Sequence, residues 1–480
     1  MSAEWPEHLL QDLCDFQNGF AFKNSDYVSG SVNTWEVFRM GYISRGGGFK
    51  EDSTPVFVPK EYSKKLDRYL LRKGDLTIAM TDMKNSMALL GHTARIPEDE
   101  RFVLNQRVGL IRVRKTETLA PLYLYYFSNS PDYIASLRSR ANSGVQVNLS
   151  TSAIKESVLK VPPLSVQKSI GETLGSLDDK IQVNHQINQT LEQMAQAIFK
   201  SWFVDFEPVK AKIAVLEAGG SEEDALLAAM QAISGKGEAE LTRLRAEQPE
   251  QYAELRATAE LFPSAMQDSE LGEIPEGWGV GALADVANLN QQSWTKRTIP
   301  SEIRYVDLAN TKNGVIESTT TYHADDAPSR ARRILSDGDT IVGTVRPGNR
   351  SFAFIKRPPK TLTGSTGFAV LSPKQAELAE FVYITATSDE AINHLAHLAD
   401  GGAYPAVRPE VVINLPCIVP TERLIACFHK TVRSFFDQAA VNKLESSTLS
   451  VLRDILLPKL LSGELSVLAT EDQLVEPPNV

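Results

Sequence analysis

Residues 166–200 read VQKSIGETLGSLDDKIQVNHQINQTLEQMAQAIFK, and this stretch decides the fold. Its seam positions alternate at spacings of four and three, the heptad pattern of a coiled coil: Ile170, Leu174, Leu177, Ile181, Asn184, Asn188, Leu191, Ala195 and Ile198. A helix over these residues would be roughly 52 Å long at ~1.5 Å per residue. The sequence therefore predicts a long helix that needs a partner along its seam.

The partner helix lies 258 residues further along the same chain. Its seam reads Phe428, Val432, Phe435, Ala439, Asn442, Ser446, Leu449, Arg453 and Leu456. Seven identities in this register fall within 19 positions, from Thr173/Thr431 to Leu191/Leu449, where about one is expected by chance. We expect the two helices to pack as an antiparallel coiled coil with pseudo-two-fold symmetry.

The repeat extends upstream of the helices. The offset of 258 begins at Leu104/Leu362 and Gly109/Gly367 and continues without a gap. Earlier landmarks have other offsets: 264 for Gly74/Gly338 and 273 for Trp5/Trp278, so the first copy carries insertions of 9 and 6 residues at its front. This contrast predicts a variable reading surface on a scaffold of fixed length.

The front of each copy mixes short strands, such as 108–113 and 368–371, with one helix each, 121–128 and 380–386. The fold class predicted is α+β, with two repeated small mixed α/β domains separated by two long helices. The expected boundaries are a first mixed domain at 1–162, a first long helix at 163–206, an acidic, partly helical connector at 207–272, a second mixed domain at 273–420, a second long helix at 421–465 and a tail at 466–480.

Charge is distributed unevenly along the chain. Its 480 residues hold 50 Lys+Arg and 60 Asp+Glu, a formal net charge of -10. Residues 38–162 sum to +8 and residues 330–360 to +6, whereas residues 207–276 sum to -9. Most of the net negative charge comes from the connector. The total charge therefore does not exclude binding of DNA phosphates by the two basic regions.

The cellular compartment is predicted by what the sequence lacks. Three cysteines are too few for a disulfide framework. The start of the chain has no basic segment followed by an apolar run, and no apolar run approaches the ~18 residues of a membrane span. We expect a cytoplasmic protein without a membrane partner.

Signatures of catalysis and metal binding are weak. Gly235-Lys236-Gly237 lacks most of a phosphate-binding Walker loop, and no Asn/Asp-Pro-Pro-aromatic turn of an amino-methyltransferase occurs. His394 and His397 have helical spacing but no evident third metal ligand. The acid-x-Lys patterns at 82–84 and 178–180 are common by chance. No catalytic residue, metal site or cofactor is predicted in this chain.

The basic fronts interleave cations with amides and hydroxyls, the side-chain types that contact phosphates and base edges. Any one of them can equally be an ordinary solvated residue. The DNA-binding candidates are Arg39, Arg45, Lys84, Asn85, Asn105, Gln106, Arg107, Gln146 and Asn148 in the first copy, and Arg346, Asn349, Arg350, Ser365, Thr366 and Arg408 in the second.

Asn184 and Asn442 occupy the same seam position in the two copies. An asparagine in a coiled-coil seam lowers stability while it specifies register. The alternative is that both are polar residues tolerated at a solvated end of the helix pair. We predict the register role for them, near the pseudo-two-fold axis.

Three long motifs carry a resemblance to a known family. Residues 198–212 read IFKSWFVDFEPVKAK, residues 269–278 read SELGEIPEGW and residues 452–465 read LRDILLPKLLSGEL. They resemble the end of the central helix, the start of the second recognition domain and the C-terminal end of the specificity subunit of a type I restriction-modification system. The resemblance covers nearly the whole chain.

The resemblance implies a non-catalytic subunit that reads double-stranded DNA. Each recognition domain would read one half of a bipartite, asymmetric site, and the helices would set the spacer and dock two methyltransferase subunits, which restriction subunits join. S-adenosylmethionine, ATP and magnesium would be used by those other subunits.

Trp202 and Phe203 either contact a methyltransferase subunit or bury against the helix pair or second domain. The alternative classes are a stand-alone methyltransferase or nuclease with divergent motifs, and a coiled-coil scaffold that does not bind DNA.

Overall fold

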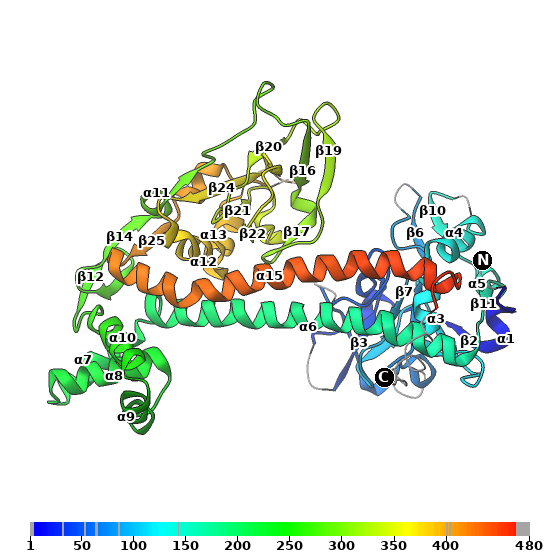
Figure 1. Ribbon diagram of the computed structural model, residues 1–480, viewed down its shortest axis with the longest axis horizontal. Helices are drawn as coiled ribbons and strands as arrows, with labels where there is room; N and C mark the ends of the chain where they lie inside the picture. The colour runs from blue at the N-terminus through cyan, green and yellow to red at the C-terminus, as the bar shows by residue number, and fades with distance from the viewer. Residues whose placement is uncertain are drawn as a thin grey trace, which may run out of the picture. The chain divides into compact units, whose positions relative to one another are not determined.

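The computed structural model describes residues 4–30, 33–51, 54–62, 66–84, 87–142, 144–399, 402 and 405–466. The chain divides into two compact units, residues 1–183 with 445–480 and residues 184–444. Both units include parts of α6 (Leu164–Phe203) and α15 (Glu422–Leu461), the two long helices of Figure 1. Each has 40 residues, about 60 Å at ~1.5 Å per residue, and each begins and ends at equivalent positions of the repeat.

In each unit the stretches of α6 and α15 run antiparallel. In the second unit Asn184 Nδ2 donates to Asn442 O (3.4 Å) while Asn188 Nδ2 donates to Ala439 O (3.2 Å), so positions rise along one helix as they fall along the other. In the first unit Arg453 pairs with Asp178 at 2.7 Å. The predicted seam residues are buried or half-buried throughout. The predicted α+β fold with two packed long helices is confirmed.

The first recognition domain contains two larger sheets and the two-stranded pairs β1-β11 and β6-β10. One larger sheet has the order β2-β9-β5-β7 and the other β4-β3-β8. Its strands are β1 (Glu7–Leu9), β2 (Cys14–Asn18), β3 (Thr34–Phe38), β4 (Phe57–Pro59), β5 (Leu76–Ala79), β6 (Thr81–Met83), β7 (Thr93–Arg95), β8 (Phe102–Leu104), β9 (Val108–Val113), β10 (Gln146–Asn148) and β11 (Val158–Lys160). Its helices are α1 (Leu10–Leu13), α3 (Pro121–Ser128), α4 (Pro131–Ser139) and α5 (Thr151–Lys155).

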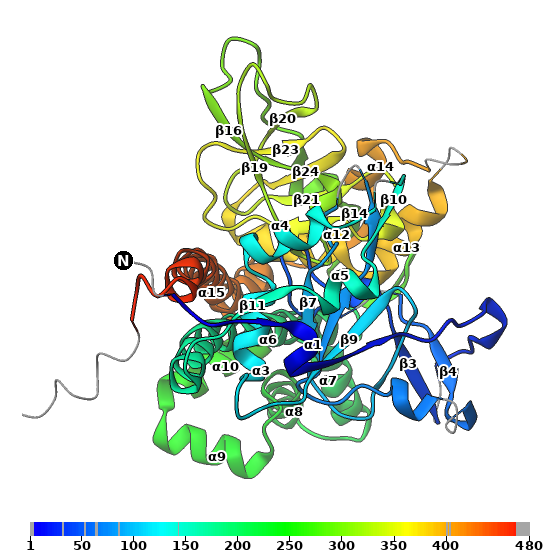
Figure 2. The same ribbon diagram turned by 90° about the vertical axis from the view of Figure 1, so that its right-hand side faces the viewer.

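The second recognition domain repeats this plan with the sheets β15-β24-β21-β22 and β19-β16-β23-β20 (Figure 2). Its strands are β14 (Gly279–Ala282), β15 (Ala287–Leu289), β16 (Glu302–Val306), β17 (Thr311–Lys312), β18 (Val315–Ile316), β19 (Thr320–His323), β20 (Ala331–Ile334), β21 (Thr340–Gly343), β22 (Phe352–Phe354), β23 (Leu362–Ser365), β24 (Phe368–Pro373) and β25 (Pro416–Val419). Its helices are α11 (Leu283–Val286), α12 (Ala379–Thr387), α13 (Asp389–Leu398) and α14 (Pro409–Ile413).

Strand pairing corrects the predicted register of the repeat. Ile78 pairs with Gly109 in the first copy, and its counterpart Val342 pairs with Ala369 in the second. The true offset in this strand is therefore 260, and Gly109/Gly367 and Leu104/Leu362 are not equivalent. The offset becomes 258 only at α3 and α12, because the β9–α3 loop is two residues longer than the β24–α12 loop. Matching glycines and leucines by identity concealed this length change.

The connector is a small helical module. It comprises α7 (Glu207–Glu217), α8 (Glu222–Ser234), α9 (Glu238–Glu247) and α10 (Pro249–Glu260), followed by the hairpin β12 (Met266–Ser269) and β13 (Gly272–Pro275). Its core includes Leu226, Met230 and Leu241. The predicted boundary after residue 272 cuts this hairpin. The described part of the chain holds no helix that is both long and apolar enough to cross a membrane.

Candidate nucleic-acid interface

A backbone ribbon in the first unit gathers most of the predicted DNA-contacting residues. Met80 N donates to Arg107 O (3.1 Å), and Leu149 N donates to Met80 O (2.8 Å). Downstream, β6 pairs with β10, and Lys84 N donates to Val145 O (3.1 Å). These bonds place the exposed or half-exposed side chains of one group on neighbouring backbone: Lys84, Gln106, Arg107, Gln146 and Asn148.

The turn between β8 and β9 contains one buried residue and two exposed residues among the DNA-binding candidates. Asn105 is 9% exposed, and its Oδ1 accepts a hydrogen bond from Arg107 N (3.4 Å). Gln106 N donates to Phe20 O (2.9 Å), while the Gln106 and Arg107 side chains are exposed. Asn105 is placed to hold the turn, and Gln106 and Arg107 are placed to meet a ligand.

Of the remaining first-copy candidates, Arg39 follows Phe38, whose carbonyl accepts a hydrogen bond from Asn105 N (3.1 Å). The half-buried Arg39 guanidinium donates to Thr54 O. Arg45 is exposed in a loop tied to β7 by the bond from Gly48 N to Thr93 O (2.8 Å). Asn85 lies outside the described residues.

The second unit repeats the ribbon at equivalent positions. Thr344 N donates to Gly367 O (2.9 Å), and Val407 N donates to Thr344 O (2.9 Å). Arg346 N donates to Pro405 O (2.7 Å). The fold therefore brings together the backbone that carries the exposed Arg346, Thr366 and Arg408, although they span more than 60 residues of sequence.

Ser365 is the counterpart of Asn105 and is fully buried. Its Oγ accepts a hydrogen bond from Gly367 N (3.2 Å), as Asn105 Oδ1 accepts one from Arg107 N. Two different residue types thus hold the same turn. The burial of Asn105 and Ser365 argues against direct base contacts by either.

Arg346 and Arg350 flank a single 3-10 turn, Pro347–Asn349, and both have left-handed backbone conformations (φ 48° and 59°). The Arg350 guanidinium donates to Asn313 Oδ1 (2.9 Å), pairs with Asp389 (2.8 Å) and lies over the Phe352 ring. The predicted DNA-binding residue Arg350 is therefore held by contacts within the second unit. Arg346 and Asn349 are exposed.

The sequence-based candidates omitted cations beside Thr366. Thr366 N donates to Arg330 O (2.8 Å), and Arg330 immediately precedes β20. Arg332 and Arg333 lie in β20. The net charge of +6 over residues 330–360 was the available signal, but charge counting alone does not say which cations share a face.

Trp202 and Phe203 are 2% and 4% exposed at the end of α6. Trp202 packs edge-on against Phe262 and Phe428, and Phe203 packs against Trp278, Phe381 and Phe428. This aromatic cluster joins the helix end to the second recognition domain within one unit. Burial argues against a direct partner contact by these two side chains and favours the intramolecular interpretation.

Asn184 and Asn442 are 1% and 5% exposed, so neither lies at a solvated helix end. Asn442 Nδ2 donates to Asn188 Oδ1 (2.9 Å), and Gln438 Nε2 donates to Asn442 Oδ1 (2.8 Å). A polar network crosses the helix seam here. Shifting either helix by one turn would break these bonds, which supports the predicted role in register.

The weak catalytic patterns have structural explanations. The Asp82 carboxylate accepts bonds from the backbone N–H groups of Met83 and Leu89, and Asp178 pairs with Arg453 and Tyr126. Burial raises the pKa of the Cys14 and Cys417 thiols to about 12, so they are protonated at neutral pH. Over the described ranges, no group of three or more His, Cys, Asp or Glu side chains could hold a metal ion.

The matching family profile and the similar curated proteins all describe specificity subunits or domains of type I restriction systems. A family profile described as "Type I restriction modification DNA specificity domain" matches residues 3–193. The HindI specificity subunit of Haemophilus influenzae is 32% identical over 96% of this chain and 100% of its own length. The MjaIX specificity subunit of Methanocaldococcus jannaschii is 23% identical over 97% and 94%. The solved type I S subunit from M. genitalium covers 95% of this chain and 96% of its own, with 15% identity and a TM-score of 0.47.

Proposed function

This chain belongs to the specificity subunits of type I restriction enzymes, and from that membership we propose that each recognition domain reads one half of a bipartite, asymmetric DNA site. A specificity subunit is the targeting component rather than the catalytic one. The observation that carries the proposal is the duplicated backbone ribbon. It gathers Gln106, Arg107 and Lys84 in one unit, and Arg346 and Arg408 in the other.

The chemistry of the ribbons fits duplex DNA. Arginine pairs with guanine, and glutamine or asparagine pairs with adenine, through two hydrogen bonds at the major-groove edge. Exposed cations beside them suit phosphates. Because the two ribbons carry different side chains on equivalent backbone, the two half-sites should differ in sequence.

The long helices set the spacer between half-sites and dock two methyltransferase subunits, which restriction subunits join. Exposed apolar side chains on the helices support the docking role, since large apolar surfaces mark protein interfaces. They are Val183, Val451, Leu452 and Ile455 in the first unit, and Ile187, Met194, Val441 and Leu444 in the second. S-adenosylmethionine, ATP and magnesium would serve the partner subunits, and the complex would act in the cytoplasm.

A domain exchange tests the two-reader proposal. Residues 1–162 are replaced by those of a relative, and adenine methylation is mapped across the genome of a host that also expresses the partner subunits. We expect one half of the recognised sequence to change while the other half and the spacer length remain. A simultaneous change of both halves would contradict the proposal.

The isolated chain provides a second test. Binding of S-adenosylmethionine or cleavage of DNA by this chain alone would favour a divergent methyltransferase or nuclease. Failure to bind DNA even with the methyltransferase subunit present would favour a scaffold without a DNA function.

A further inference from the structure

The second recognition domain carries a row of cations beside the backbone ribbon that holds Arg346, Thr366 and Arg408. We call this row the basic edge and define it as Lys296, Arg297, Arg330, Arg332 and Arg333. Lys296, Arg297 and Arg330 are exposed, and the other two are half-buried. None of the five forms an ion pair with any residue that the structure describes.

Two segments distant in sequence build the basic edge. The loop before β16 is fastened to β20 because Trp294 N donates to Arg332 O (2.8 Å) and Arg333 donates to Ser293 Oγ (3.2 Å). The Trp294 indole N–H also donates to Thr363 Oγ1 (2.9 Å) on β23. These bonds hold the loop against an edge strand of the sheet.

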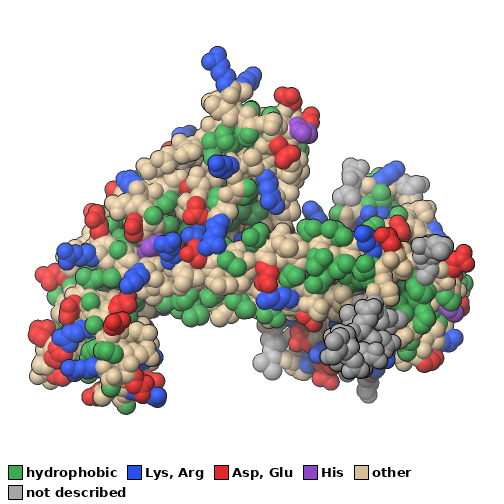
Figure 3. All heavy atoms as spheres, viewed as in Figure 1, with side chains coloured by type: hydrophobic (Ala, Val, Ile, Leu, Met, Phe, Trp, Pro, Cys, Tyr) green, Lys and Arg blue, Asp and Glu red, His purple; other side chains and the backbone are tan. Residues whose placement is uncertain are grey.

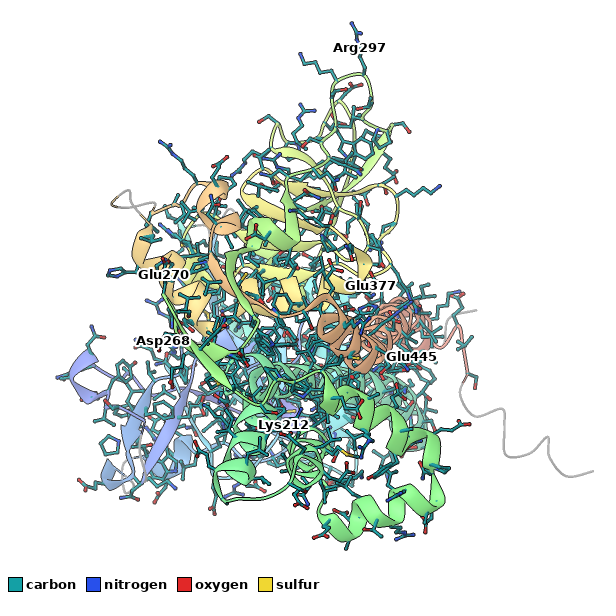
Figure 4. The ribbon with its side chains drawn as sticks, turned by 90° about the vertical axis from the view of Figure 1, so that its left-hand side faces the viewer. Lys212, Asp268, Glu270, Arg297, Glu377 and Glu445 are labelled. Carbon is teal, nitrogen blue, oxygen red and sulfur yellow. The ribbon has the colours of Figure 1, made fainter. Side chains whose placement is uncertain are left out.

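The tip of this loop is ordered by its own hydrogen bonds. Thr295 and Thr298 hydroxyls lie 2.9 Å apart, and Ile299 N donates to Thr295 O (3.1 Å). Lys296 and Arg297 lie within this turn. Figure 4 shows Arg297 at the loop tip, pointing away from the sheet, and Figure 3 shows Lys and Arg side chains projecting at that end.

The basic edge is continuous with this backbone ribbon. Thr366 N donates to Arg330 O, so Arg330 is adjacent to the turn that carries Thr366. Glu410 attracts Arg333 electrostatically. Arg332 Nε donates to Ser329 O (3.2 Å), so Lys296, Arg297 and Arg330 are the exposed cations of the edge.

Among the described residues of the first recognition domain, the equivalent backbone carries different side chains. This backbone is identified by the Leu70–Val103 bridge, which corresponds to the Ile334–Thr363 pair in the second copy. Leu66 and Tyr69 are buried there, and Arg68 donates to the Tyr69 hydroxyl and lies over its ring. The described positions equivalent to Arg330, Arg332 and Arg333 are therefore Leu66, Arg68 and Tyr69, so one of the three is a cation.

We propose that the basic edge binds DNA phosphates beside the half-site read by the second domain, without regard to base sequence. This inference rests on the proposed function. Unpaired cations on an ordered loop suit phosphates, which carry charge but no sequence information. The second domain would then hold more backbone than the first and contribute more of the salt-dependent affinity.

The test uses the full chain assembled with its methyltransferase subunit and a duplex that contains the recognised site. Affinity is measured against salt concentration for Lys296→Ala/Arg297→Ala. Since each phosphate contact contributes ~0.9 to the slope of log affinity against log salt, we expect the slope to fall by about 2. The matched control, Lys236→Ala/Arg243→Ala, removes two cations from the helical module and should leave the slope unchanged.

Further variants and duplexes distinguish the outcomes. Lys296→Arg/Arg297→Lys keeps both charges and should keep the slope, and loss of affinity should be equal on cognate and scrambled duplexes. An unchanged slope in the alanine variant, or a changed methylation sequence, would overturn the inference. So would weaker assembly with the methyltransferase subunit at unchanged DNA affinity, which would make the edge a protein contact. Failure of the unaltered complex to bind DNA would instead sink the proposed function itself.

Discussion

The two recognition domains share a backbone plan but differ in the contacts that hold it. At one equivalent position Leu122 of α3 packs on Gly171 of α6, where an added Cβ would lie 3.1 Å from Leu122 Cγ. In the second copy Glu380 of α12 meets His429 of α15 at 2.5 Å, and Glu380 is fully buried. An apolar contact and a buried polar pair thus perform the same packing task.

A second difference lies at the turn that precedes β5 in the first copy and β21 in the second. Asp75 and Asp339 each accept a backbone N–H bond within the same turn, from Arg72 N (2.8 Å) and Ser336 N (2.7 Å). Asp75 also binds Arg112, whose counterpart at offset 260 is Ser372, a hydrogen-bond partner of Asp339. The duplicated feature is the hydrogen-bonded turn, and its outer partner has changed.

The Glu380–His429 pair offers the largest expected effect. Removing the partner of a fully buried carboxylate is strongly destabilising, so His429→Ala should lower the free energy of unfolding by about 3 kcal/mol or more. Glu380→Leu/His429→Gly recreates the first-copy contact and should recover most of that stability. Thermal unfolding monitors both. A double variant as unstable as the single one would mean that the two contacts are not interchangeable.

Arg346 and Arg350 can be separated by function. Arg346→Ala should weaken DNA binding by about 1–3 kcal/mol if the guanidinium reads a base, or lower the salt slope by about 1 if it meets a phosphate. Arg350→Ala should act mainly on thermal stability, because Arg350 is bound by Asn313 and Asp389. DNA titrations and melting curves of both variants check this. Unchanged affinity and slope for Arg346→Ala would place it outside the interface.

Replacing both seam asparagines tests whether these polar residues specify the register in which the two long helices pair. Asn184→Leu/Asn442→Leu should raise stability by about 1–2 kcal/mol while reducing the specificity of helix pairing. The measurement is oligomeric state by light scattering, alongside thermal unfolding. A variant that remains a monomer and pairs its helices as specifically as the unaltered protein would contradict the register role of the two asparagines.

The smallest effect is expected at Asp339. Burial raises the pKa of Asp339 above its usual 3.8, against hydrogen bonds from Ser372 and Ser336. Asp339→Asn should therefore change stability at neutral pH by less than about 1 kcal/mol, because the ionised carboxylate is the disfavoured form. As pH falls from neutral through the raised pKa, the unaltered protein should gain stability relative to Asp339→Asn.

Asp75→Asn is the matched comparison for that substitution. It removes the ion pair with Arg112 and should destabilise the protein more than Asp339→Asn does at neutral pH. Unfolding across a pH series compares the two variants. Equal losses at neutral pH would show that the arginine partner contributes nothing to the difference between the copies.

Much of the fold could be predicted from the sequence because the helices are long and periodic. The seam from Ile170 to Ile198 and its copy predicted two helices whose ends the structure places at equivalent residues. The strand register was harder. Identical residues at Gly109 and Gly367 suggested an equivalence. The strand partners Ile78 and Val342 show instead that Gly109 is equivalent to Ala369, because the loops that follow differ in length by two residues.

The candidate site was predictable in residue type but not in exposure. Nothing in the sequence distinguished the buried Asn105 and Ser365 from the exposed Gln106 and Thr366, because turn residues one position apart point in different directions. The cations at Arg330 and Lys296 became candidates only when the hydrogen bonds of Thr366 and Trp294 brought their segments together.

The sequence by itself determined the duplication, the long helix pair, the acidic connector and the family, because periodicity, charge and long motifs are local or repeated properties. Tertiary structure alone decided which cations share a face and which are used internally. Those outcomes depend on contacts between segments as distant as Arg350 and Asn313, or Arg346 and Pro405. Long-range pairing is set by the packing of the whole domain, and local patterns do not encode it.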